Sequence, residues 1–272
     1  MAIKETITTA PVPPRHDLYE HYAGNEFTNP ELVDTALRVH AEGYTTMGFV
    51  SDDAIAPDGT LDETIDHSRG CFTDYYLAVN PGNARDMATM RKINIPPSGT
   101  VEDLPAFQLS KEGLYPEGIS FLRNLESDGY HIKEIAGLAR TKESPASSVY
   151  ELLRSVLQEA LHKDEVWLFS IVSSTFDSLT KYFGHTAFNV IGADVKINDY
   201  RVNERIQLRP SIVIPNMLFE SMIRDVEHAS SPKSQLKILG MFMYFTDGIN
   251  EATMGERSAA YRRSLLALDG KG

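Results

Sequence analysis

The sequence predicts one α/β domain built on a mixed sheet, with helices packed against it. With 272 residues, of which 42% are hydrophobic, the chain can bury a sizeable core without disulfide bonds. Two strand-like segments, 71–80 and 86–95, are joined through a Pro-Gly-Asn turn, which favours an antiparallel pair. A strand, a helix and another strand follow over residues 132–174, an order typical of a parallel crossover. The two arrangements together predict a mixed sheet.

The first part of the chain divides into an arm and a helix. Residues 1–24 are rich in Thr, Pro and charge without a hydrophobic period, so we expect a flexible N-terminal arm there. The main domain is expected over 25–227. Its first helix has Asn29 as a cap and Pro30 in the first turn. The apolar positions of this helix share one face: Leu32, Val33, Ala36 and Leu37, with His40 beside them. An acidic loop over 51–70 precedes the two antiparallel strands.

The second part alternates helices and strands. After the strand 132–140, residues 149–163 have helical periodicity and residues 165–174 are rich in β-branched and aromatic residues. A helix over 175–184 ends at a glycine. The segments 188–197 and 204–215 are strand-like and favour an antiparallel pair at the far edge of the sheet. We expect a C-terminal helical extension over 228–272.

Composition and charge exclude several classes of function. The formal net charge of −12 argues against nucleic acid as a partner, because such proteins need a basic surface. The longest apolar run, 238–245, is far shorter than the roughly 20 residues of a membrane-spanning helix. The single cysteine, Cys71, and an N-terminus without an apolar segment favour a cytoplasmic location. The histidines have no metal-ligand spacing, so no metal site is expected.

Three segments resemble those of GNAT acyltransferases, especially the acyl-homoserine-lactone synthase and N-acyl amino acid synthase branches. Those branches carry a helix ending in an aromatic-rich segment, a strand with an arginine, and a strand that reads approximately E-I-S-R-x-A-V. The counterparts here are HAEGYTTMGF, MRKINI and EIAGLAR, in the same order. The resemblance spans roughly residues 29–225 and implies a GNAT-like fold.

The resemblance also implies an activity. Such enzymes transfer a medium or long acyl chain from a phosphopantetheine thioester, carried by an acyl carrier protein or CoA, to a small amine such as an amino acid. No bound cofactor is then required. Gly137 stands where the lactone synthases have arginine, which argues against a homoserine lactone product. The loop TKESPASS contains no glycine, which argues against plain acetyl-CoA.

Glu134 is the predicted base, because acyl transfer to an amine requires removal of an amine proton. Alternation places Glu134 with Ile132, Ala136 and Leu138 on one strand face, and apolar neighbours raise the pKa of a carboxylate. An alternative is an ion pair between Glu134 and Arg91 of the neighbouring strand, which would lower that pKa and orient the site. The resemblance also makes Arg91 a site residue.

Further residues are expected to bind the thioester arm. Gly137 lies within a strand, where glycine indicates a bulge, a close approach of ligand to backbone, or close packing of the crossover helix. Four residues around the next helix start are candidates for a phosphate site, although a serine there is also a good N-cap. These four are Arg140, Lys142, Ser147 and Ser148.

Two residues near the next helix complete the predicted site. Tyr182 matches the place of the GNAT tyrosine that protonates the leaving thiolate; alternatively, it packs between helix and sheet with a wet hydroxyl. Ser173 lies where the strand ends and a pantetheine could enter. Two other functions remain open: a noncatalytic acyl-ligand-binding or regulatory protein of the same fold, and a small-acyl acetyltransferase.

Overall fold

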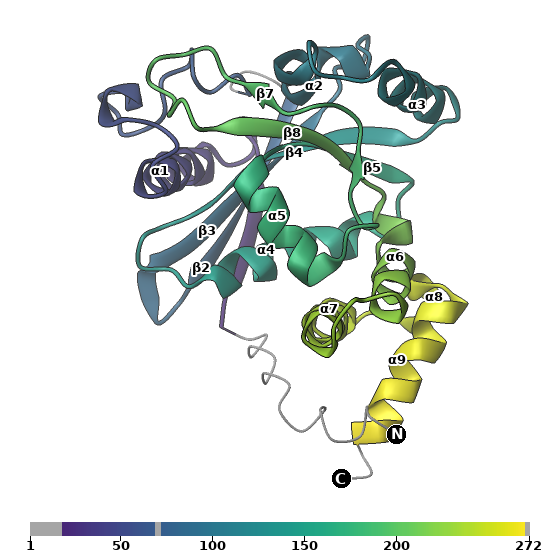
Figure 1. Cartoon of the computed structure of the whole chain (residues 1–272). Coiled ribbons are helices and arrows are strands. Elements are labelled where there is room, and N and C mark those ends of the chain that lie inside the picture. Colours follow the sequence, from purple (N-terminus) through teal and green to yellow (C-terminus); the bar gives the residue numbers. More distant parts are fainter. Residues whose placement is uncertain (1–17, 69–71, 270–272) are drawn as a thin grey trace.

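An eight-stranded mixed sheet forms the centre of the protein (Figure 1). The computed structural model describes residues 18–68 and 72–269. The strand order is β1-β2-β3-β4-β5-β8-β6, with β7 also paired to β8; β4 and β5 are parallel and the other pairs antiparallel. The predicted mixed sheet is therefore confirmed. The strands are β1 (Glu20–Gly24), β2 (Phe72–Asn80), β3 (Asn83–Asn94), β4 (His131–Arg140), β5 (Glu165–Val172), β6 (Asn189–Val190), β7 (Val195–Lys196) and β8 (Gln207–Val213).

Helices cover both faces of the sheet. One face carries α1 (Pro30–Thr46), α2 (Pro105–Ser110) and α3 (Pro116–Ser127); the other carries α4 (Ala146–Ala160) and α6 (Pro215–Glu227). Strand β3 shows the alternation, because Met90 belongs to the core under α4 and Ile93 to the core under α2 and α3. The remaining helices are α5 (Ser173–Phe183), α7 (Pro232–Thr246), α8 (Glu251–Met254) and α9 (Glu256–Asp269), with short 3₁₀ turns at Asp52–Ala54 and Val101–Asp103.

Helix α1 begins as its sequence predicts. The Asn29 side chain accepts a hydrogen bond from the Leu32 amide at 3.2 Å, and Pro30 occupies the first turn. The predicted apolar face is buried, and His40 is buried with it at 4% exposure. Because His40 lies near the end of this face, α1 carries a polar ring into the interior beside β3.

The structure differs from the sequence prediction in its N-terminal half. Residues 20–24, placed in the arm, form the edge strand β1, which pairs with β2. Residues 1–17 and Cys71 lie outside the described residues. Helices α2 and α3 were not predicted, although each starts with a proline at its first position, a recognised helix-start signal. The segment 188–197 does not form one continuous strand, because its ladder pairing with β8 is confined to Asn189–Val190 (β6) and Val195–Lys196 (β7).

The C-terminal extension is helical, as predicted, and it belongs to the main core. Ile238, Phe242 and Phe245 of α7 are buried in the same cluster as Phe183 and Phe219. The apolar segment of α7 therefore packs against the core of the domain. No helix among the described residues has the length and apolar character needed to cross a bilayer.

The sheet opens between β4 and β5. These strands pair only from His131 to Glu134 on β4, and the rest of β5 pairs with β8 on its other side. At the opening, the β3–β4 register shifts between Thr89 and Arg91, which forms a bulge that contains Gly137. Gly137 has a φ of +60°, a conformation that favours glycine.

Candidate active site

A pocket of about 220 Å³ lies at this opening. Ala136, Gly137 and Leu138 of β4 line one side, and residues 169–172 of β5 line the other. The remaining walls come from α1, the 61–68 loop, the connection between β7 and β8, and residues of α2 and α5. The pocket therefore joins the open edge of a strand to groups on the α1 face of the sheet.

Glu134 lies in this pocket, at the last position of β4 that pairs with β5. It is only 4% exposed, and its Oε2 accepts a hydrogen bond from the Ala106 amide of α2 at 2.7 Å. Burial raises the pKa of Glu134 to about 7, against smaller lowering effects of the Ala106 amide and Arg91. A carboxylate with this pKa can accept a proton near neutral pH, as a general base must.

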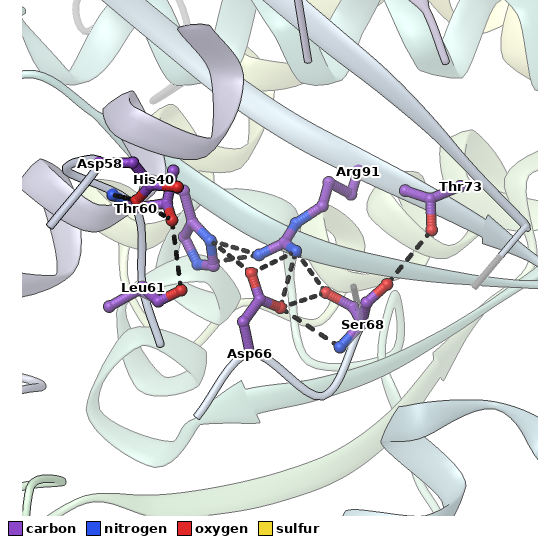
Figure 2. A network of polar contacts seen from close by, with 8 residues as sticks. All are labelled: His40, Asp58, Thr60, Leu61, Asp66, Ser68, Thr73 and Arg91. Carbon is purple, nitrogen blue, oxygen red and sulfur yellow. Dashed lines mark hydrogen bonds and ion pairs between the residues drawn. The ribbon is translucent and has the colours of Figure 1, made fainter. Parts of the chain in front are cut away.

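Arg91 is the centre of a buried polar network with Asp66, Ser68 and His40 (Figure 2). Its Nη1 donates to both carboxylate oxygens of Asp66 at 2.7 Å and contacts the Ser68 hydroxyl, while Nη2 contacts the His40 ring. The alternative prediction of an ion pair between Arg91 and Glu134 is therefore wrong, because the Arg91 guanidinium pairs with Asp66. Burial pushes the pKa of Asp66 up, but Arg91, His40 and Ser68 hold it well below its ordinary value.

His40 is neutral in this network. Burial and the neighbouring Arg91 lower its pKa to about 4, although Asp66 acts in the opposite direction. Since a guanidinium only donates hydrogen bonds, the neutral ring can accept from Nη2. The network thus holds one cation and one anion that compensate each other.

The bulge changes which β4 side chains share a face. Ile132 and Ala136 pack in the core under α2 and α3, as expected for the face of Glu134, but Leu138 packs in the opposite core with Ile135. The prediction for Leu138 was wrong because the extra residue at Gly137 inverts the alternation. A Cβ atom on Gly137 would lie 2.5 Å from Arg91 Nε, so the glycine makes room for Arg91 rather than for the crossover helix.

The four predicted phosphate-site residues extend from the end of β4 to the first turn of α4, outside the residues that line the pocket. Arg140 contacts the Ser144 carbonyl, and the Lys142 amide donates to Glu42 at 2.9 Å. The N-cap is Pro145, so Ser147 and Ser148 occupy the first turn and the prediction of a serine cap was wrong. Ser148 is buried and its hydroxyl donates to the Pro145 carbonyl.

Tyr182 and Ser173 are both placed on α5. The Tyr182 ring lies beside Tyr150, with centroids 6.1 Å apart, and neither Tyr182 nor Ser173 lines the pocket. Ser173 donates to Asp194 at 2.7 Å and to the Gln207 carbonyl. It is the first residue of the helix rather than the end of β5. Thr175 and Leu179 are the α5 residues that line the pocket.

The sequence prediction missed His40, Asp66 and Ser68 as members of the site. A repeated signal was present, because Asp58, Asp62 and Asp66 are each followed two residues later by Thr or Ser. Each aspartate accepts hydrogen bonds from both the amide and the hydroxyl of that residue. The pattern indicates successive turns, but it does not reveal that Arg91 meets the third of them. Across residues 18–68 and 72–269, no cluster of His, Cys, Asp and Glu has the arrangement of a metal site.

The comparisons with known proteins concern the fold. No protein-family model and no curated protein matches the chain. The structure of FeeM, an N-acyl amino acid synthase from uncultured soil microbes, has a TM-score of 0.52 and 18% identity, covering 75% of this chain and 95% of FeeM. The chain has a GNAT-like fold.

Two further structures were found at lower similarity. MesI, a CoA-dependent acyl-homoserine lactone synthase, has a TM-score of 0.48 and 12% identity, with 85% of this chain and 96% of MesI covered. A probable acetyltransferase from Staphylococcus epidermidis has a TM-score of 0.39 and 12% identity, with 72% and 98% covered. The GNAT-like fold predicted from the sequence is confirmed by FeeM.

Proposed function

We propose that this protein is an N-acyltransferase that moves an acyl chain from a phosphopantetheine thioester to a small amine. The observation that carries the proposal is the position of Glu134, a buried carboxylate with a pKa near 7 where β4 and β5 separate. The GNAT-like fold supports it. The donor is an acyl carrier protein or CoA, and the acyl chain is of medium or long length.

The opening between the strands suits an extended thioester arm. Beyond Glu134, the edge of β4 is no longer paired with β5, so its backbone groups are available to a ligand. An arm that enters there would place its carbonyl beside Ala136 and Gly137, which line the pocket. Backbone donors near that carbonyl would stabilise the oxyanion of the tetrahedral intermediate.

The proposed reaction needs one general base, which removes a proton from the amine. The amine nitrogen attacks the thioester carbon, a C–N bond forms, and Glu134 accepts the proton that the nitrogen loses. The C–S bond then breaks, and the thiolate leaves on the arm and takes up a proton. The products are an amide and a free thiol. Tyr182 as the acid for that last proton stays a prediction.

Glu134→Gln tests the role of the base. Glutamine preserves the shape of the side chain but cannot accept the proton, so kcat should fall about 10²-fold or more. The readout is thiol release with acyl-CoA and acyl-carrier thioesters against an amine panel. Glu117→Gln, an exposed position on α3, is the matched control and should keep full activity. An unchanged kcat in Glu134→Gln would remove Glu134 from catalysis.

The same assay tests the activity itself. Amine-dependent thiol release, with an amide of the expected mass, supports an acyltransferase, and the preferred chain length separates long-acyl from acetyl transfer. Binding of the thioesters without release across the whole panel would instead favour the noncatalytic acyl-binding function.

A further inference from the structure

Half-buried apolar side chains line part of the pocket. They come from the end of α1 and the turn after it, the 61–68 loop and the connection between β7 and β8. We call this group the apolar chamber: Tyr44, Phe49, Ile65, Ile197 and Ile206. Their incomplete burial leaves apolar surface, and a ligand that covers it gains free energy from its removal from water.

The walls of the chamber are held to one another by hydrogen bonds and a ring contact. The Asn203 amide donates to the Phe49 carbonyl at 2.9 Å, and the Ser51 amide to the Arg201 carbonyl at 2.9 Å. Arg201 also donates to Thr64 at 2.5 Å, which joins the 61–68 loop to the same connection. The rings of Tyr44 and Phe49 meet edge to face, with centroids 5.6 Å apart. Such a chamber needs little reordering to bind a ligand.

The polar groups of the pocket favour a cation. Asp66 is compensated by Arg91 at 2.7 Å, so an ionised Glu134 leaves one net negative charge among these three buried groups. Asp66 is also close enough to Glu134 to raise its pKa. An ammonium group beside Glu134 would be stabilised by that charge, more strongly in a buried site than in water.

Two parts of the substrates are apolar enough to fill the chamber: the acyl chain of the donor and the body of the amine. An acyl chain would fill the chamber but would place no positive charge beside Glu134. An amine with an apolar body would do both, since its nitrogen would lie beside Glu134 while its body covers Phe49 and its neighbours. The second arrangement therefore accounts for both the apolar chamber and the charge of Glu134.

We infer that the acceptor is an amine with an apolar body, aromatic or branched aliphatic, and that the apolar chamber binds this body with the nitrogen at Glu134. The inference rests on the proposed function, because it names the acceptor class of the same site. Phe49 is then a specificity-determining residue.

The test compares two amines and a series of donors in the wild-type protein and in Phe49→Ala. The amines are 2-phenylethylamine and ethanolamine, and the donors are octanoyl, dodecanoyl and hexadecanoyl thioesters of CoA and of a carrier protein. Phe72→Ala is the matched control, since Phe72 is 55% exposed and lies outside the chamber. Calorimetry of each amine without donor gives a readout that does not depend on turnover.

The wild-type protein should prefer 2-phenylethylamine by about 10-fold or more in kcat/KM. Phe49→Ala should lose most of that preference through a higher KM and a weaker Kd, with the order of donor chain lengths unchanged and Phe72→Ala like the wild type. A shifted chain-length order with an unchanged amine preference would overturn the inference and place the acyl chain in the chamber. Equal use of both amines by the wild type would also overturn it.

Failure of the proposed function would look different. If no donor releases thiol with any amine, while 2-phenylethylamine binds the wild type and binds Phe49→Ala more weakly, the acyltransferase proposal fails and the amine site stands.

Discussion

At the scale of single residues, two buried carboxylates of one pocket have opposite environments. Asp66 accepts hydrogen bonds from Arg91 and Ser68, and its pKa lies below the ordinary value despite burial. Glu134 has the Ala106 amide as its hydrogen-bond donor, and burial raises its pKa to about 7. Carboxylates whose environments separate their pKa values in this way take different roles. The contrast supports our proposal that Glu134 is the base, with Asp66 as a structural group.

The pH dependence of activity follows from the pKa of Glu134. The base must be deprotonated to act, so kcat/KM should rise with pH through about 7 and fall by about tenfold per pH unit well below it. Asp66 should not add a second ionisation to the profile in this pH range, because its pKa is lowered rather than raised. The measurement is kcat/KM from pH 5 to 8.5, with Glu134→Gln as the variant that lacks the limb. A flat wild-type profile over that range would contradict the assignment.

At the scale of elements, the bulge of β4 links the strand opening to the Arg91 network. Gly137 adopts a positive φ, and Arg91 Nε lies 2.5 Å from the position that its Cβ would take. The same residue therefore shapes the open edge of β4 and leaves space for the guanidinium that pairs with Asp66. The backbone of β4 and the side chains of the α1 face are coupled at this one position.

Gly137→Ala should destabilise the protein more than an alanine at an open glycine. Gly129 is the matched control, since it also has a positive φ, of +88°, but has no atom within 4 Å of its built Cβ. We expect about 1 kcal/mol for Gly129→Ala from backbone strain, and about 1–3 kcal/mol more for Gly137→Ala from the contact with Arg91. Denaturant unfolding measures the free energy of unfolding of both variants. Equal decreases would show that the Arg91 side chain can move away from the new Cβ without destabilising the protein.

At the scale of the whole molecule, the C-terminal helices complete the core on the α4 face. In Figure 1 they lie together at one end of the molecule, with α7 beside α6. The contacts of α7 with α5 and α6 bury Phe242 and Phe245 to 1% exposure. The expected extension therefore shares the hydrophobic core of the domain, which gives it a role in stability.

Phe242→Ala measures that role. Truncation of a fully buried phenylalanine should lower the free energy of unfolding by about 3–5 kcal/mol. Leu266→Ala on α9 is the control, because Leu266 is 44% exposed and its loss should stay within about 0.5 kcal/mol. Urea unfolding of both variants provides the comparison. A loss under about 1 kcal/mol for Phe242→Ala would mean that the extension folds independently of the sheet.

The sequence by itself determined the elements whose signals are local. The cap at Asn29, the turn between β2 and β3, the crossover from β4 through α4 to β5, and Glu134 as the buried carboxylate all follow from residue type and periodicity. Glycine within a strand also indicated a bulge before its φ was known.

Only the tertiary structure decided which groups meet. Asp66 lies 25 residues from Arg91, and His40 lies 51 residues from it, so no local pattern could assign them to one network. The bulge inverted the alternation at Leu138, and the edge strand β1 is held by pairing with β2 rather than by its own composition. Pairing, burial and charge compensation depend on contacts between distant segments, and those contacts exist only once the sheet has formed.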